Sequence, residues 1–293
     1  MIKLSTTVRT ERSAVSISLK DKVMMLGSCF SDEIGAKMRE CGFDVCVNPF
    51  GPLYNPASLL AAVRRLDSGD EFTASDCVRM GAGSGLVCSF SHNTAFARET
   101  EEEFLENANT ALREAAQFWK ECRKVIITLG TSQVWEHREA GIVGNCLKRD
   151  PSEFIHRMLS PDECLDCLKE MTEKHPDKEF IFTVSPIRHL GEGARTNTLS
   201  KATLHLALGR LEQSSEEQRF PEKKISYFPA WEILCDELRD YRFYAEDLVH
   251  PSGTAVEIIW ERFLESVALP DELTSIEQNA RMSRRNAHRP LRG

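Results

Sequence analysis

Short apolar runs alternate with amphipathic segments along the chain. Runs rich in Val, Ile, Met and Phe, of the length of buried strands, lie at 22–28, 43–51, 124–132, 178–186 and 224–230. Segments in which apolar residues recur every three or four positions, as on one face of a helix, lie at 31–41, 55–66, 101–122, 161–175, 199–213 and 253–267. This alternation predicts an α/β protein: a mostly parallel sheet with helices on both faces, in three α/β/α layers.

Two stretches interrupt this alternation, at 72–99 and 134–160. The first contains a glycine cluster at 81, 83 and 85 beside apolar residues, which predicts a small β-hairpin. Because insertions between core elements shape the clefts of α/β proteins, we expect both stretches to form pocket walls. We expect a single domain over 1–270, followed by a flexible basic C-terminal tail over 271–293.

The composition excludes several classes of function. A net charge of -8 disfavours nonspecific binding of nucleic acid, which needs a positive face. The chain has no apolar run of about 18 residues and no signal-peptide core, so we expect a cytoplasmic protein that does not enter a membrane. Ten cysteines are scattered, and the one CxxC, Cys164–Cys167, has no second ligand pair, so we expect neither a metal nor a cofactor.

Polar residues follow the predicted strands at the edge where α/β proteins bind ligands, beyond the carboxyl ends of the strands. They are Ser28 and Cys29 after the first strand, Asn48 and Gly51 after the second, Thr131, Ser132 and Gln133 after the third, and Arg188 and His189 after the fourth. Asp247 and His250 stand in the loop before the last helix. We expect all of these residues to meet at one edge of the sheet.

This set contains the parts of a catalytic triad. Ser28 is a candidate nucleophile, His250 the base that takes its proton, and Asp247 the carboxylate that orients the imidazole. The backbone N–H groups of Ser28 and Gly51 are candidate oxyanion donors. Cys29 is the alternative nucleophile, since a thiol there would gain from the same helix N-terminus. Only one of the two adjacent side chains can face a given cleft.

Seven residues are candidates for contact with a substrate: Asn48, Thr131, Gln133, His92, Arg188, His189 and Arg242. His189 also follows a strand and competes with His250 for the role of base. The two arginines would bind an acidic group, or would pair with the carboxylates of 246–247.

Several long motifs resemble the GSCFA family. They include "LGSCFSDEIG", "NPFGPLYNPASL", "TLGTSQVWE" and "DELRDYRFYAEDLVHPS". That family is similar to a branch of the SGNH, or GDSL-type, hydrolase superfamily, which implies a flavodoxin-like sheet. The resemblance implies Ser28 as the nucleophile, Asp247 and His250 as its partners, and Gly51 as an oxyanion glycine. Cys29 would then face inward.

The chain departs from the superfamily pattern at two places. The usual Gly-Asp-Ser reads Gly27-Ser28 here, without the Asp. A Gly-x-Asn after the third core strand reads Gly130-Thr131-Ser132, so Ser132, Gln133 or Asn48 would have to replace the Asn as an oxyanion donor.

These features together predict an acyl or acetyl esterase that acts on a small-molecule or glycan ester through a serine acyl-enzyme. Two alternatives remain open. The same triad would serve an acyltransferase with a sugar or alcohol acceptor, and the same scaffold would serve a binding protein without catalysis.

Overall fold

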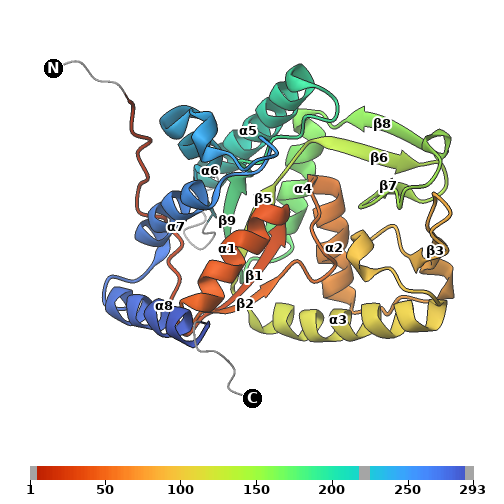
Figure 1. Ribbon diagram of the computed structural model, residues 1–293, viewed down its shortest axis with the longest axis horizontal. Coiled ribbons are helices and arrows are strands. Elements are labelled where there is room, and N and C mark those ends of the chain that lie inside the picture. The colour runs from red at the N-terminus through yellow and green to blue at the C-terminus, as the bar shows by residue number, and fades with distance from the viewer. Residues whose placement is uncertain (1–4, 218–224, 288–293) are drawn as a thin grey trace.

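The centre of the molecule is a five-stranded parallel sheet (Figure 1). The computed structural model describes residues 5–217 and 225–287. The strands are β1 (Lys22–Gly27), β2 (Asp44–Val47), β5 (Lys124–Leu129), β9 (Glu179–Val184) and β10 (Ile225–Tyr227), in the order β10-β9-β5-β1-β2. This is the flavodoxin-like order, whose switch point lies between β1 and β5. The predicted fold class is confirmed.

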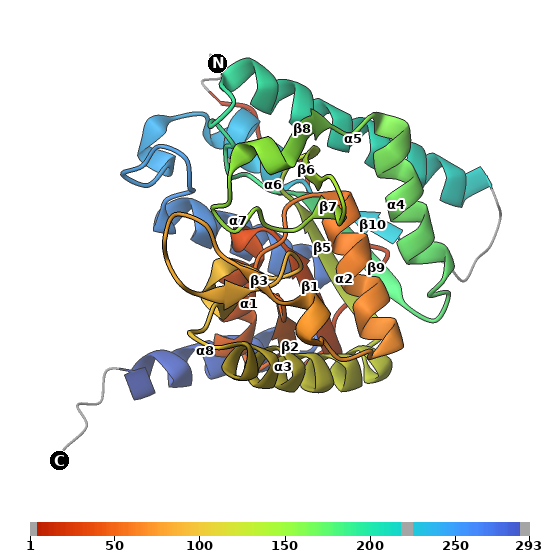
Figure 2. The same cartoon turned by 90° about the vertical axis from the view of Figure 1, so that its right-hand side faces the viewer.

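Helices cover both faces of this sheet (Figure 2). One face packs against α2 (Pro56–Ser68), α3 (Glu101–Glu121), α4 (Pro161–Glu173) and α5 (Ala194–Glu217), and the other against α1 (Cys29–Glu40), α6 (Ala230–Glu232), α7 (Gly253–Val267) and α8 (Leu273–Ala287). The first core lies between the sheet and α2 to α5, and the second core lies between the sheet and α1, α6, α7 and α8. Because side chains alternate along a strand, Met24 and Leu26 of β1 enter the first core, whereas Val23 and Met25 enter the second core.

Polar side chains fix the beginnings of the main helices. Ser28, Asn55, Thr100, Ser160 and Ser252 each accept a hydrogen bond from a backbone N–H in the first turn of α1, α2, α3, α4 and α7. Short turns of 3-10 helix lie at Ala74–Asp76, Thr94–Phe96, Pro151–Glu153 and Tyr241–Phe243, and a π-helical turn spans Ile233–Leu238.

The two interrupting stretches form small antiparallel sheets beside the main one. In the first, β3 (Val78–Arg79) pairs with β4 (Val87–Cys88), as the predicted hairpin requires. In the second, β6 (Gln133–His137) pairs with both β7 (Gly141–Val143) and β8 (Phe154–Met158). Backbone hydrogen bonds from Gly81 to Leu147 and from Gly144 to Phe90 join the two stretches, which lie together on the right of Figure 1.

The C-terminal segment differs from its prediction as a flexible tail. Residues 273–287 form α8, whose Ile276 is buried in the second core. The Asn279 amide donates to the Cys41 carbonyl at 3.0 Å, and Glu272 accepts from the Ser18 hydroxyl at 2.7 Å. The prediction is wrong here because one apolar side chain and its flanking polar groups find partners on the domain. Residues 288–293 lie outside the described part of the chain.

None of the helices that the structure describes has the length and apolar character needed to cross a membrane.

Candidate active site

A thiol, an imidazole and a carboxylate form a contiguous row at the carboxyl edge of the sheet. The Cys29 sulfur lies 3.6 Å from Nε2 of His250, and Nδ1 of His250 lies 2.6 Å from Oδ2 of Asp247. A carboxylate can only accept a hydrogen bond, so Nδ1 carries the proton and Nε2 presents its lone pair to the thiol. The order is that of nucleophile, base and orienting acid.

Cys29 occupies the turn between β1 and α1, at the topological switch point of the sheet. Gly27 precedes it with φ of 151°, and a Cβ at Gly27 would collide with the Thr128 backbone of β5. Cys29 is the first residue of α1, and within the described chain its backbone N–H has no acceptor. A positively polarised amide therefore sits beside the sulfur.

Ser28 is oriented away from this row. Its side chain is fully buried, donates to the Ser185 hydroxyl at 3.0 Å and accepts from the Phe30 N–H at 3.4 Å. The predicted pairing of Ser28 with His250, with Cys29 facing inward, is the reverse of the observed arrangement. The reason is local: an N-cap side chain turns back over the end of its helix, whereas the next residue projects from the first turn.

The loop that carries Asp247 and His250 is held in a tight turn. Oδ1 of Asp247 accepts from the N–H groups of Val249 and His250, both at 2.9 Å, and Leu248 adopts a left-handed φ of 57°. These bonds, with the His250 N–H as the largest contributor, hold the pKa of Asp247 at about 2. The carboxylate therefore stays ionised throughout the neutral range.

Arg188 anchors the same loop. Its backbone N–H donates to the Val249 carbonyl and its guanidinium to the Leu248 carbonyl, each at 3.1 Å. Its guanidinium therefore bonds to the Leu248 carbonyl and not to the 246–247 carboxylates, and it holds the loop that carries the imidazole. Contact of Arg188 with an acidic substrate group stays a prediction.

The thiol of Cys29 is not a preformed thiolate. Burial, and then the nearby Asp32 carboxylate, raise the pKa of Cys29, while the backbone amides of Cys29 and Phe30 oppose that rise. Burial also raises the pKa of Asp32, although the Asn48 amide donates to it at 2.8 Å. Ionisation of this thiol would therefore need a base, and Nε2 of His250 is in contact with the sulfur.

The predicted oxyanion donors are occupied by other partners. The N–H of Ser28 donates to the Thr128 carbonyl at 3.1 Å, and the N–H of Gly51 to the Asn48 carbonyl at 2.7 Å. Ser132 is fully buried, and both its N–H and its hydroxyl contact the Ser200 hydroxyl, at 2.7 and 3.2 Å. These donors therefore bond to neighbouring groups of the protein and are not directed at the Cys29 thiol.

Asn48 is also committed to the structure of the turn. Its Oδ1 accepts from the Gly27 N–H at 2.9 Å while its amide donates to Asp32. The backbone N–H of Cys29 is therefore the oxyanion donor that the geometry offers. The sequence carries a signal for this N–H, because Cys29 stands where the first apolar run ends and a helix begins.

His189 and Tyr54 lie next to the row formed by Cys29, His250 and Asp247. Their rings meet edge to face at 5.6 Å, over Gly130, where a Cβ would lie 3.2 Å from both side chains. Nε2 of His189 is buried without a partner in the described chain. Burial, and then the charge of Lys201, lower the pKa of His189 to about 4, so it is neutral. Lys201 is itself buried and donates to the Gly130 and Ser185 carbonyls at 2.6 and 2.8 Å.

A cavity of about 260 Å³ lies beside His189 and Tyr54. Thr131, Gln133 and His189, all of them sequence candidates, line it together with Tyr54. Its other walls come from Asn55, Trp135, Val143, Gly144, His156, Gly191, Glu192, Thr196, Asn197 and Ser200. Trp135 and His156 stack at 4.2 Å and give the cavity a flat aromatic side.

Two sequence candidates lie outside the site. His92 is fully buried among the rings of Phe50, Phe72, Phe96 and Phe104, bonded to Ser89 at 2.6 Å, and burial lowers its pKa to about 3. It is a core residue. Arg242 is exposed, does not line the cavity of about 260 Å³ and approaches Asp240 at 3.6 Å instead of the 246–247 carboxylates.

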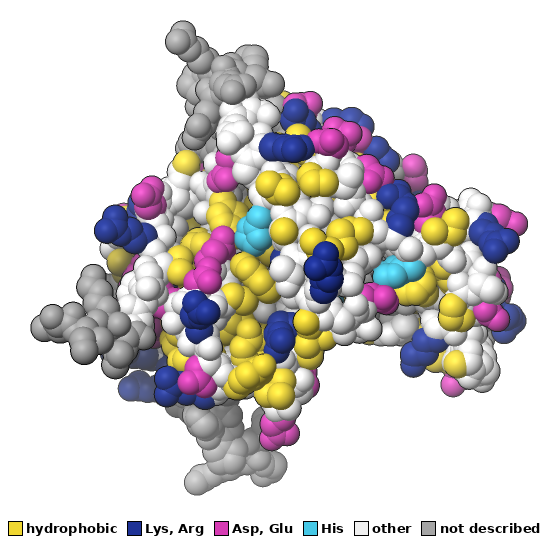
Figure 3. Space-filling view, turned by 90° about the horizontal axis from the view of Figure 1, so that it is seen from above, with side chains coloured by type: hydrophobic (Ala, Val, Ile, Leu, Met, Phe, Trp, Pro, Cys, Tyr) yellow, Lys and Arg dark blue, Asp and Glu magenta, His cyan; other side chains and the backbone are white. Residues whose placement is uncertain are grey.

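One face of the molecule is chemically mixed. Figure 3 shows one face on which apolar side chains gather toward the middle, with acidic and basic side chains scattered around them. Within the described ranges, no group of three or more His, Cys, Asp and Glu side chains is placed to hold a metal ion.

The fold and this row define an α/β protein with a Cys-His-Asp constellation at the switch point of a flavodoxin-like sheet. The sequence profile of the GSCFA family matches residues 22–263, and the chain belongs to this family. The predicted resemblance is confirmed. A search of curated protein sequences finds no significant match.

Several solved structures resemble this one at low sequence identity. A proposed acylhydrolase from Bacteroides fragilis NCTC 9343 is 10% identical, with a TM-score of 0.43 over 89% of this chain and 88% of that chain. A GDSL-like lipase from Bacteroides thetaiotaomicron VPI-5482 is 12% identical, with a TM-score of 0.41 over 88% of each chain. A family two carbohydrate esterase from Clostridium thermocellum, in complex with cellohexaose, is 12% identical, with a TM-score of 0.40 over 89% of this chain and 67% of that chain.

Proposed function

We propose that the protein hydrolyses carboxylic esters of small molecules or glycans, with Cys29 as the nucleophile, His250 as the base and Asp247 as the orienting carboxylate. The contact of 3.6 Å between the Cys29 sulfur and Nε2 of His250 carries this proposal. The Asp247–His250 bond fixes the tautomer that the reaction needs.

In the first half of the reaction, the sulfur attacks the ester carbonyl carbon while Nε2 of His250 takes the thiol proton. The carbonyl oxygen becomes negative and accepts from the Cys29 N–H. As the tetrahedral intermediate collapses, the C–O bond to the alcohol breaks, and the imidazolium returns its proton to the leaving oxygen. The products are a thioester on Cys29 and a free alcohol.

In the second half, water attacks the thioester carbonyl and His250 takes a proton from it. The C–S bond breaks, the thiolate regains a proton from the imidazolium, and a carboxylic acid is released. Asp247 remains ionised through both halves, in keeping with its low pKa. The chain supplies every group that these steps need.

The two alternatives are separable by experiment. An acyltransferase would use the same thioester, and the share of product formed on an added sugar or alcohol would distinguish it from a hydrolase. A binding protein would not need a nucleophile within reach of the imidazole, and the Cys29–His250 contact speaks against that alternative.

The test is ester hydrolysis by wild type, Cys29→Ala and His250→Ala, with 4-nitrophenyl acetate and acetylated sugars as substrates. Loss of either group should lower kcat/KM by about a thousandfold or more, because the nucleophile and its base act as a unit. Hydrolysis that survives Cys29→Ala at the wild-type rate would refute the proposal.

A further inference from the structure

A buried lysine bridges two strands at the edge of the sheet where the thiol, imidazole and carboxylate lie, and it has no part in the mechanism above. Lys201 of α5 is 2% exposed, and its ammonium group donates to the carbonyl of Gly130 at 2.6 Å and to that of Ser185 at 2.8 Å. Gly130 directly follows β5, and Ser185 directly follows β9. The lysine therefore joins the carboxyl ends of two neighbouring strands.

Both carbonyls belong to segments that contact the site. The Ser185 hydroxyl accepts from the Ser28 hydroxyl at 3.0 Å, and Ser28 immediately precedes Cys29. The N–H of Gly130 donates to the Tyr54 carbonyl at 2.8 Å. The ammonium group is therefore linked through Ser185 to the turn that carries the thiol, and through Gly130 to Tyr54.

The ammonium group of Lys201 is surrounded by groups that attract a cation. Two of its N–H bonds are directed at carbonyl oxygens, and the centre of the Trp231 ring of α6 lies 5.0 Å from its nitrogen. Burial lowers the pKa of Lys201 to about 7, whereas thiolates at Cys235 and Cys29 would raise it. The charge of Lys201 is therefore sensitive, near neutral pH, to the ionisation of Cys29.

Charge coupling of this kind acts in both directions. Because a thiolate at Cys29 favours the ammonium form of Lys201, the ammonium form favours the thiolate by the same free energy. The Asp32 carboxylate acts in the opposite sense on the same thiol. Lys201 is therefore a source of positive charge that opposes the effect of Asp32.

The other titratable groups around Lys201 do not supply this positive charge. They are His189 after β9, His205 on α5 and Cys235 in the π-helical turn. Burial, and then the charge of Lys201, lower the pKa of both histidines. Both imidazoles are therefore neutral at pH 7, and the lysine is the cation of this group.

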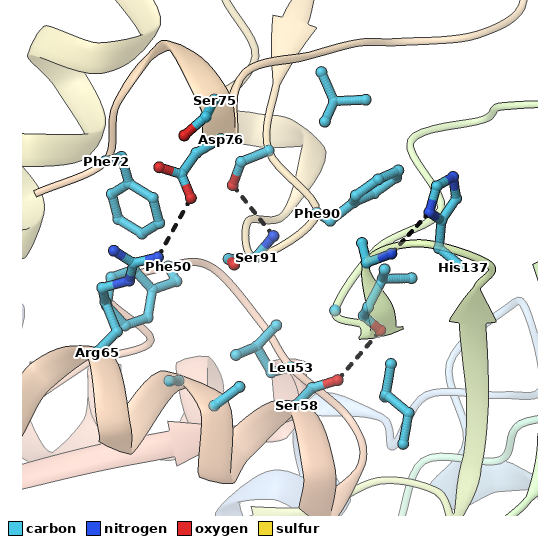
Figure 4. A pocket seen from close by; sticks show the side chains of 18 of the residues that line it. Phe50, Leu53, Ser58, Arg65, Phe72, Ser75, Asp76, Phe90, Ser91 and His137 are labelled. Carbon is cyan, nitrogen blue, oxygen red and sulfur yellow. Dashed lines mark hydrogen bonds and ion pairs between the residues drawn. The ribbon is translucent and has the colours of Figure 1, made fainter. Parts of the chain in front are cut away.

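Lys201 is separate from the cavities near the site. It lines neither the cavity of about 260 Å³ nor a second cavity, of about 480 Å³, which Figure 4 shows between α2 and the β6–β7 hairpin. Residues of both inserted stretches, 72–99 and 134–160, line this second cavity. Substitution of Lys201 should therefore leave both linings in place.

We propose that Lys201 is a positioning residue of the ester hydrolysis: its ammonium group holds the turns after β5 and β9, and its charge stabilises the negative charge that Cys29 acquires when His250 removes the thiol proton. This inference rests on the proposed function and adds a residue to it. Because Lys201 is buried, it acts through these turns and through its charge, and not by contact with the substrate.

Lys178→Met is the matched control for Lys201→Met. Lys178 is also buried, and its ammonium group donates to the Trp119 and Cys122 carbonyls at 2.6 and 2.7 Å, with the Trp119 ring at 4.4 Å. It directly precedes β9, so it lies at the opposite end of the β5–β9 pair from Lys201. Each substitution removes one buried ammonium group and two bonds to carbonyls. A merely structural role therefore predicts the same result at both positions.

The first measurement is the rate of iodoacetamide labelling at Cys29, resolved by peptide mass spectrometry. Lys201→Met should slow this labelling at least about threefold at pH 7, because loss of the cation disfavours the thiolate. The difference from wild type should narrow as the pH rises, because Lys201 then loses its proton in the wild type. Lys178→Met should leave the labelling of Cys29 unchanged.

The second measurement is steady-state hydrolysis of 4-nitrophenyl acetate. Lys201→Met should lower kcat about tenfold and change KM less than about twofold, because the charge acts on the chemical step. Urea unfolding of the Lys201 and Lys178 variants separates these effects from a loss of stability. Lys201→Gln keeps an N–H donor without the charge, so it should show the same slower labelling and serves if Lys201→Met does not fold.

Two results would overturn this role of Lys201. One is labelling of Cys29 that is no slower in the Lys201 variants than in wild type, and the other is an equal change in Lys201→Met and Lys178→Met. Labelling needs no substrate, so it decides the role of Lys201 whether or not the wild type hydrolyses an ester. If Cys29→Ala abolishes hydrolysis while the Lys201 variants behave as wild type, the proposed function stands and only this inference fails.

Discussion

At the scale of single residues, the adjacent Ser28 and Cys29 make different contacts in the turn between β1 and α1. Ser28 caps α1 and bonds to Ser185, whereas Cys29 presents its sulfur to His250. Cys29 also packs against the second core, whereas the hydroxyl of Ser28 bonds to Ser185 and to the first turn of α1. Substitution of Ser28 should therefore act mainly on the stability of the turn.

Ser28→Ala should destabilise the protein and leave most of the ester hydrolysis in place. The substitution removes an N-cap bond and a buried hydrogen bond, which together cost about 1–3 kcal/mol in the free energy of unfolding. Urea unfolding measures this cost, with Cys29→Ala as the control for the neighbouring position. A Ser28→Ala protein of unchanged stability that had lost all hydrolysis would contradict these roles.

Asp32→Asn should lower the pKa of the Cys29 thiol. The Asp32 carboxylate disfavours the thiolate, so its neutral replacement shifts thiolate formation to lower pH while the side-chain oxygen still accepts from Asn48. The pH dependence of iodoacetamide labelling, resolved by peptide mass spectrometry, reports this. Wild type should label through a range above the ordinary value of about 8.5, and the variant through a lower range. Labelling of Cys146 serves as the internal control, and an upward shift at Cys29 would contradict the assignment.

At the scale of elements, the site depends on one loop and one strand-to-helix turn. The loop over 245–252 closes on itself through a bond from the Ala245 N–H to the His250 carbonyl at 2.8 Å. Arg188, after β9, ties the loop to the sheet edge. The imidazole is therefore positioned by two elements that are far apart in sequence.

Arg188→Met should lower kcat about tenfold with a smaller change in KM, because a misplaced base weakens the chemical step more than binding. The backbone bond from residue 188 to Val249 survives the substitution, so the thermal midpoint should move little. Steady-state kinetics with a short ester checks this. A rise in KM at constant kcat would instead show that Arg188 binds the substrate.

The last helix is a further element whose contribution can be measured. Ile276→Ala should cost about 2–4 kcal/mol in the free energy of unfolding, since the side chain is buried in the second core. Met282→Ala on the exposed face of α8 should cost less than about 0.5 kcal/mol. Equal, small losses at both positions would mean that α8 does not pack as described.

At the scale of the whole molecule, the alternation of apolar runs and helical patterns was sufficient to predict the layers. Strand length and helix spacing are local properties, and they determine which faces must be buried. The sheet order then brings Cys29 to the switch point beside β5. The Asp247–His250 bond was predictable from the spacing Asp-x-x-His together with the place of the loop before the last helix.

The orientation of Ser28 and Cys29 could not be derived from residue type. It depends on which residue caps the helix, because a shift of the helix start by one position would exchange the orientations of the two side chains. When the superfamily pattern Gly-Asp-Ser is aligned without a gap to Gly27-Ser28-Cys29, Cys29 takes the position of the serine in that pattern. The packing of Ile276, and the pairing of Ser132 with Ser200, depend on tertiary contacts that no local pattern contains.

The central claim is that Cys29 forms the acyl-enzyme. Its most direct test is rapid acid quenching of the enzyme with a short activated ester, followed by peptide mass spectrometry of the turn at 23–35. A thioester on Cys29 is expected in wild type, with none on Ser28 and none in Cys29→Ala. An acyl group on Ser28, or an adduct that persists in Cys29→Ala, would contradict it.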